Sequence, residues 1–191
     1  MNAPAPGPAI FWVAWGSYVL LEAWVAFRDH RAGVRASTSD PGVLSITVAF
    51  LGAAVLAFVA AWKVDSLDLG GWAPLIVGVA LIAAGIALRL WAILTLGQFF
   101  RRIVVIQEGH RVVTEGPYRY VRHPSYTGAL LSMLGTGIAL GNVLSIAICL
   151  VVPALGYIPR IPTEEAELER GLGEEYRRYE ARTSRLIPGV W

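Results

Sequence analysis

The sequence is poor in cysteine, histidine and charge. Cys149 is the only cysteine, so an intrachain disulfide is excluded. The three histidines, His30, His110 and His123, are far apart and show no metal-ligand spacing, so we expect no metal site. The net charge of +2, with no isolated basic run, argues against a nucleic-acid partner. A soluble domain carries about 25% charged residues, whereas this chain carries 16%. The shortage of charge therefore indicates that a lipid bilayer surrounds much of the protein.

The first nine residues, MNAPAPGPA, also lack positive charge. A secretory signal peptide begins with a basic region and ends at a small-residue cleavage site. We therefore predict that residues 1–9 are a disordered lead rather than a signal peptide, because prolines and small residues bury little surface.

What the sequence does contain is a series of apolar runs. A bilayer core about 30 Å thick needs around 20 apolar residues per helix. The runs predict an all-α integral membrane protein, a single domain over residues 1–191 with about five transmembrane helices. The predicted helices are 10–27, 43–62, 74–96, 126–140 and 143–158. The first three form an N-terminal part, 10–96. The last two are short and joined by Gly141-Asn142, which predicts a tight helical hairpin within residues 97–191, with a kink at Pro153.

Basic residues indicate how the helices are oriented. All Lys and Arg except Lys63 and Arg89 fall in three regions, 28–42, 97–125 and the tail from 159. These regions alternate along the five predicted helices, and basic loops stay in the cytoplasm. We therefore expect the N-terminus outside, and the two basic loops and the C-terminus in the cytoplasm. Arg89 and Glu22 are charges within spans, for which we favour interface placement or a mutual ion pair over catalysis.

The C-terminal tail has features of its own. Pro159 and Pro162 predict the end of the fifth helix. Thr163 is a suitable N-cap for a new helix, and Glu164 and Glu165 favour its positive end. We expect an amphipathic helical tail that lies at the membrane interface or folds back over the hairpin.

The densest polar cluster covers residues 107–126. Pro124 suits the first position of a helix. Free backbone N–H groups at His123–Tyr126 would then form a pocket for a carboxylate or phosphate. The alternative is an ordinary basic cytoplasmic loop in which tyrosines anchor the interface. Sequence spacing alone does not separate the two interpretations.

A second polar cluster lies at 160–165. Arg160 and Glu164 would meet as an i,i+4 pair if the backbone is helical there. The alternative is that Arg160 reaches the interface along its aliphatic stem and that Glu164 only complements the helix dipole.

These clusters together resemble the isoprenylcysteine carboxyl methyltransferase (ICMT) family, part of a wider group that includes phospholipid N-methyltransferases. The resemblance rests on GPYRYVRHPSYTG, the following hairpin, Arg160 with Glu164-Glu165, and LGEEYRRYEARTSRLIP. It covers about residues 95–188. It implies a multi-pass enzyme that binds S-adenosylmethionine at the cytoplasmic face and methylates a lipophilic acceptor entering from the bilayer.

The same resemblance implies the site residues. Arg160 and Glu164 would be catalytic, and Arg160 would contact the acceptor. The implied cofactor contacts are Gln107, His110, Arg111, Val112, Val113, Tyr118, His123, Pro124, Ser125, Tyr126 and Glu164. Glu164 suits the cofactor's ammonium, and tyrosine ring faces suit its sulfonium. A carboxylate acceptor, such as that of an isoprenylcysteine, is favoured because it needs no general base.

Other functions stay open. The acceptor could be a lipid amine or a thiol. An NADPH-dependent sterol-type reductase shares an RHPxYxG segment and a C-terminal Ile187-Pro188-Gly189, although the Glu164-Glu165 pair and the short chain favour a methyltransferase. A non-enzymatic membrane scaffold would bind no cofactor.

Overall fold

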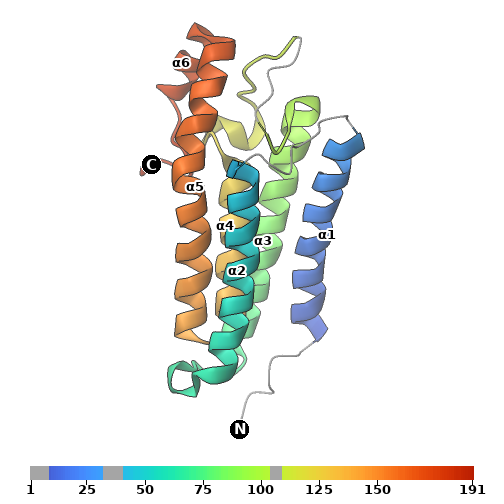
Figure 1. Ribbon diagram of the computed structural model, residues 1–191, viewed down its shortest axis with the longest axis vertical. Coiled ribbons are helices and arrows are strands. Elements are labelled where there is room, and N and C mark those ends of the chain that lie inside the picture. Colours follow the sequence, from blue (N-terminus) through green and yellow to red (C-terminus); the bar gives the residue numbers. More distant parts are fainter. Residues whose placement is uncertain (1–8, 32–40, 104–108) are drawn as a thin grey trace.

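Five long helices run side by side along one axis in the computed structural model, which describes residues 9–31, 41–103 and 109–191 (Figure 1). They are α1 (Ala9–Arg31), α2 (Pro41–Lys63), α3 (Ala73–Leu96), α4 (Pro124–Ala139) and α5 (Val143–Leu172). Short helices η1 (Asp65–Leu67), η2 (Gly97–Phe99), η3 (Gly116–Arg119) and α6 (Glu174–Glu180) lie between or after them. The prediction of an all-helical chain with a closing hairpin is confirmed.

Four of these helices are long and apolar enough to cross a membrane. They are Ala9–Arg31, Leu44–Lys63, Ala73–Phe99 and Val143–Leu172. Large apolar side chains such as Val13, Leu51 and Val55 point out of the bundle, as expected where lipid is the solvent. The chain is therefore a multi-pass membrane protein. Helix α4 has only 16 residues, so a fifth crossing stays a prediction.

Helices α3 and α4 approach each other closely through glycines. A Cβ atom at Gly85 would lie 2.5 Å from the carbonyl oxygen of Gly128, and one at Gly78 would lie 2.5 Å from that of Gly135. Both separations are too short for a side chain, so the two backbones touch where the glycines face each other. On α4, Gly128, Ser132 and Gly135 supply this contact surface.

Helix α5 departs from the prediction. It continues through Pro153, Pro159 and Pro162 to Leu172, so the expected break after residue 158 is wrong. Thr163 is not an N-cap, because its Oγ1 donates to the carbonyl of Pro159 at 3.1 Å inside the helix.

Packing explains why α5 continues. The lost hydrogen bonds of the prolines are local costs, whereas α5 is anchored at several points along its length. Asn142 caps its start by accepting from the N–H groups of Leu144 and Ser145. Tyr157 and Ile161 are buried against Leu186 of the tail.

The tail folds back over the hairpin, one of the two arrangements expected. The N–H groups of Arg122 and His123 donate to the carbonyls of Ser184 and Arg185, at 2.8 and 3.0 Å. One end of the bundle holds α6, the described part of the loop before α4 and the last turn of α1, and we call it the polar end (Figure 1). The first residues of α1 lie at the other end.

Candidate functional site

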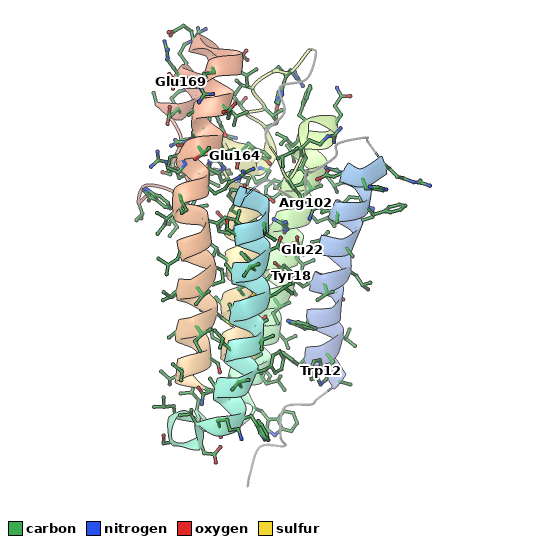
Figure 2. All side chains as sticks on the ribbon, viewed as in Figure 1. Trp12, Tyr18, Glu22, Arg102, Glu164 and Glu169 are labelled. Carbon is green, nitrogen blue, oxygen red and sulfur yellow. The ribbon has the colours of Figure 1, made fainter. Side chains whose placement is uncertain are left out.

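A cavity of about 400 Å³ opens at this polar end and continues down between the helices. Its wall combines loop residues from 99–103 and 110–123, the first turn of α4, the polar part of α5 and α6 with side chains of α1, α2 and α3. Figure 2 shows Glu164, Arg102, Glu22 and Tyr18 at successive levels along the bundle, and all four line the cavity. Its volume falls within the range of small-molecule sites, about 300–1,000 Å³.

Most residues implied by the resemblance meet at the polar end of this cavity. The implied residues on its wall are His110, Arg111, Val112, Val113, Tyr118, His123, Ser125, Tyr126 and Glu164. Pro124 is fully buried at the first position of α4 and is not on the wall. Gln107 lies outside the described residues.

Glu164 is held by the first turn of α4. The hydroxyl of Tyr126 donates to Glu164 Oε2 at 2.6 Å. The Tyr126 ring stacks on Tyr157, with centroids 4.2 Å apart, and on His123, with centroids 5.4 Å apart. These contacts leave the carboxylate partly exposed and facing the cavity, beside stacked aromatic rings.

A second aromatic pair flanks the polar end. The rings of Phe99 and His110 lie 4.6 Å apart and 10° from parallel. Phe99 was not predicted, since nothing in the sequence distinguishes it from the apolar residues that end α3.

The expected anion pocket at the start of α4 is not supported. The N–H groups of Arg122 and His123 already bind the tail, and those of Tyr126 and Thr127 bind the carbonyl of His123. Pro124 has no N–H, so the free donors on which the prediction depended are largely occupied.

Arg160 lies just behind the wall. Its Nη2 donates to the carbonyl of Arg102 at 3.1 Å, and its Nε lies 3.9 Å from Glu164 Oε2. The i,i+4 pair is confirmed, because α5 stays helical through residue 164. The guanidinium itself is buried and does not line the cavity.

Glu165, beside Glu164, was expected only to favour a helix end, and it instead joins three segments. Its Oε1 accepts from Arg122 Nε at 2.8 Å and lies 3.2 Å from His123 Nε2. Its Oε2 accepts from Arg185 Nε at 2.9 Å. Arg122 also donates to the carbonyls of Glu180 and Thr183. One buried carboxylate therefore attaches the C-terminal tail and the start of α4 to α5.

Two buried tyrosines near the polar end, Tyr118 and Tyr179, remain protonated at neutral pH. Burial raises the pKa of Tyr118 and of Tyr179 well above the usual range. The hydroxyl of Tyr179 donates to the carbonyl of Tyr118 at 2.8 Å. These groups can donate hydrogen bonds but cannot remove protons at neutral pH.

Below the polar end, the wall contains one ion pair among apolar residues. Arg89 Nε lies 2.6 Å from Glu22 Oε1, and Arg89 Nη2 donates to Glu22 Oε2 at 2.9 Å. Arg89 Nη1 donates to the carbonyl and hydroxyl of Ser125. The expected ion pair is confirmed, and it connects α1 to α3 and α4.

The deepest part of the cavity is apolar. Phe50 and Ala54 of α2 line it together with Met133 of α4. Neither α1 nor α2 carries a sequence signature, yet both contribute to the wall. Among the described residues, no group of three or more His, Cys, Asp or Glu side chains lies close enough to hold a metal ion.

Residues 77–170 match the model of the isoprenylcysteine carboxyl methyltransferase (ICMT) family. Protein-S-isoprenylcysteine O-methyltransferase B of Arabidopsis thaliana is 38% identical over 115 residues, which are 59% of this chain and 58% of that protein. The protein-S-isoprenylcysteine O-methyltransferase of Schizosaccharomyces pombe is 38% identical over 109 residues, covering 56% of this chain and 46% of that protein. The chain thus spans about half the length of these curated relatives.

A solved structure agrees with the sequence matches. The eukaryotic intramembrane Ras methyltransferase ICMT superposes with a TM-score of 0.64 and 32% identity. The superposition covers 75% of this chain and 52% of that one. Sequence and fold together place this chain in the isoprenylcysteine carboxyl methyltransferase family.

Proposed function

We propose that this protein is an S-adenosylmethionine-dependent methyltransferase that esterifies the carboxylate of a lipophilic, isoprenylcysteine-like acceptor. The observation that carries the proposal is the continuity of the cavity, in which the Glu164 carboxylate and stacked rings at one end lead into an apolar interior between α1, α2 and α4. Such a cavity admits a charged, water-soluble ligand at one end and a hydrocarbon chain at the other.

The polar end fits the cofactor. Glu164 is a partly exposed carboxylate suited to an ammonium group. The paired rings of Phe99 and His110 suit a flat base, and tyrosine faces suit a sulfonium cation. When bound, S-adenosylmethionine supplies an electrophilic methyl group that passes to an acceptor oxygen and leaves S-adenosylhomocysteine. The chain's own contribution is to position the two ligands in line, since positioning accounts for much of the rate in such a displacement.

The acceptor is proposed to be a carboxylate because the groups on the described wall that could remove a proton, His110, His123, Glu22 and Glu164, each already make another contact. A carboxylate is already nucleophilic at neutral pH, whereas an amine or thiol must first lose a proton. Tyr118 and Tyr179 stay protonated. Arg160, next to Glu164, is the arginine proposed to hold the acceptor carboxylate, by turning its guanidinium toward the cavity while Nη2 stays on the Arg102 carbonyl.

We place the polar end in the cytoplasm. The basic residues of loop 97–123 and of the tail gather there, as the positive-inside rule requires. Related proteins named protein-S-isoprenylcysteine O-methyltransferases support the substrate class. The acceptor itself is proposed only as a chemical class.

The test is binding followed by product chemistry. The detergent-purified protein is titrated by calorimetry with S-adenosylmethionine, with S-adenosylhomocysteine and with NADPH. Methyl-labelled cofactor is then supplied with N-acetyl-S-farnesylcysteine, and the product is treated with base. Label released as methanol identifies a methyl ester, because N-methyl and S-methyl products survive base.

Each other function gives a different result. Label that resists base would assign an amine or thiol acceptor and reject the carboxylate. Binding of NADPH without the adenosyl ligands would move the protein to the reductases. Binding of neither ligand would support a scaffold and reject the proposal.

A further inference from the structure

Asp29, in the last turn of α1, is a buried carboxylate outside the segment that matches the family. Only 2% of its surface is exposed. Burying a carboxylate is costly unless it is paired and hydrogen-bonded. Its Oδ2 accepts from the backbone N–H of Arg102 at 3.1 Å and lies 3.5 Å from Arg102 Nε. Both contacts go to one residue, at the start of the loop that forms the polar end.

The preceding residue, Arg28, holds the same short segment. Its Nη2 donates to the carbonyl of Phe100 at 2.9 Å, and its guanidinium carbon lies 5.2 Å from the centre of the Phe100 ring. The last turn of α1 therefore binds a carbonyl at residue 100 and an N–H at residue 102. Two such contacts fix the direction of the peptide groups between them.

The next peptide group of this segment binds Arg160. The carbonyl of Arg102 accepts from Arg160 Nη2 at 3.1 Å. Arg160 in turn lies beside Glu164, which Tyr126 holds in place. A continuous series of polar contacts thus runs from Asp29 through Arg102 to the arginine proposed to meet the acceptor.

We propose that Asp29 is a positioning residue for Arg160, acting through the backbone of Arg102; this role rests on the proposed methyl transfer. Asp29 touches neither ligand. It orients the Arg102 carbonyl, and this carbonyl sets the direction of the Arg160 guanidinium. The first helix, which shows no sequence motif, thereby takes part in the chemistry at the opposite side of the bundle.

A simpler interpretation is that Asp29 only attaches α1 to the bundle. In that case its loss would lower stability and would reduce turnover independently of Arg160. A double-mutant cycle separates the two, because residues that act as one unit show non-additive effects.

The cycle compares the wild-type protein with D29A, R160A and the double variant. The readouts are kcat and KM for N-acetyl-S-farnesylcysteine and the Kd of S-adenosylhomocysteine. We expect D29A to lower kcat/KM for the acceptor by about tenfold or more, with the Kd changed less than twofold. In the R160A background, the D29A change should alter kcat/KM less than twofold.

Two further variants serve as controls. D29N, which keeps one acceptor for the Arg102 N–H, should have a kcat/KM between those of D29A and the wild type. D65N, at an exposed aspartate at the far end of the bundle, is the matched control.

Two results would overturn the role of Asp29. One is that D29A lowers kcat/KM for the acceptor by the same factor in the wild-type and in the R160A backgrounds. The other is a loss of S-adenosylhomocysteine affinity as large as the loss of kcat/KM, which would place the effect on the cofactor instead.

A spectroscopic readout keeps this inference separate from the proposed function. The ¹⁵Nε resonance of Arg160, assigned by its absence in R160K, should shift in D29A and D29N but not in D65N. An unmoved resonance would contradict the role of Asp29 even in an active enzyme. A shifted resonance in a protein that transfers no methyl group would support the structural coupling between Asp29 and Arg160 and would reject only the proposed methyltransferase function.

Discussion

The two ends of the cavity are built in different ways. At the polar end, side chains are fixed by directional contacts, as when Tyr126 donates to Glu164 and Arg122 donates to Glu165. At the deep end, Phe50, Ala54 and Met133 contribute apolar surface and shape. A directional contact requires one residue type at one position, whereas an apolar wall requires only a suitable volume. Substitutions should therefore have larger and more specific effects at the polar end.

The largest effect is expected for Glu165→Ala. Arg122, whose side chain is 8% exposed, would lose its closer and more buried carboxylate partner and keep only Glu180, at 3.5 Å. Removing one partner of a buried ion pair costs about 3–5 kcal/mol. For a protein of this size we expect the midpoint of thermal unfolding to fall by about 10 °C. Differential scanning fluorimetry in detergent measures this directly.

Glu167→Ala is the control for that measurement. Glu167 pairs with Arg170 on the surface, at 2.8 Å, and such pairs contribute little. Its loss should change the free energy of unfolding by about 0.5 kcal/mol or less. Equal midpoints in the two variants would show that Glu165 does not hold the tail and would remove the proposed difference between buried and exposed contacts at this end.

The next effect is expected for Glu164→Ala. A hydrogen bond to a charged group contributes about 1.5–3 kcal/mol, so we expect S-adenosylmethionine to bind roughly 10- to 150-fold more weakly. Calorimetry supplies the Kd. Glu169→Ala is the matched control, since Glu169 lies farther along the same helix and pairs with Arg177 at the surface (Figure 2).

The expected pattern for Glu164 also distinguishes it from Arg160. Glu164→Ala should weaken the cofactor first, whereas Arg160→Ala should impair turnover more than cofactor affinity. Normal cofactor affinity in Glu164→Ala would eliminate the ammonium contact and leave the polar end without its main cofactor group.

The contrast between the ends also explains what the sequence could predict. Apolar runs place the first four helices and the start of α5 to within a few residues, because a bilayer imposes length and composition. Apart from Pro124, the residues of the RHPSY segment meet at the cavity, because Pro124 starts a helix with His123 as its N-cap and Tyr126 in its first turn. The deep wall was not predictable, since Phe50 and Ala54 look like any apolar residues of a spanning helix.

Glu165 was missed for an identifiable reason. Tyr157, Ile161 and Glu165 follow each other at four-residue spacing, and all three are buried on one face of α5. The spacing would have marked Glu165 as a buried acid had the helix been predicted to continue. The two prolines in this stretch favoured a break, and the packing that overrides them cannot be read from local sequence.

The smallest effect is expected at the deep end, for Ala54→Phe. The added ring would occupy the part of the cavity proposed for the acceptor's hydrocarbon chain, while the polar contacts stay intact. Differences of this kind in an apolar pocket are worth about 1–3 kcal/mol. We expect KM for N-acetyl-S-farnesylcysteine to rise about tenfold and KM for the shorter S-geranyl analogue to rise less, with the Kd of S-adenosylhomocysteine unchanged. Val55→Phe, at the next residue and facing outward with 62% exposure, should change neither. A loss of cofactor affinity in Ala54→Phe without any dependence on chain length would mean that the two ends do not divide cofactor and acceptor between them.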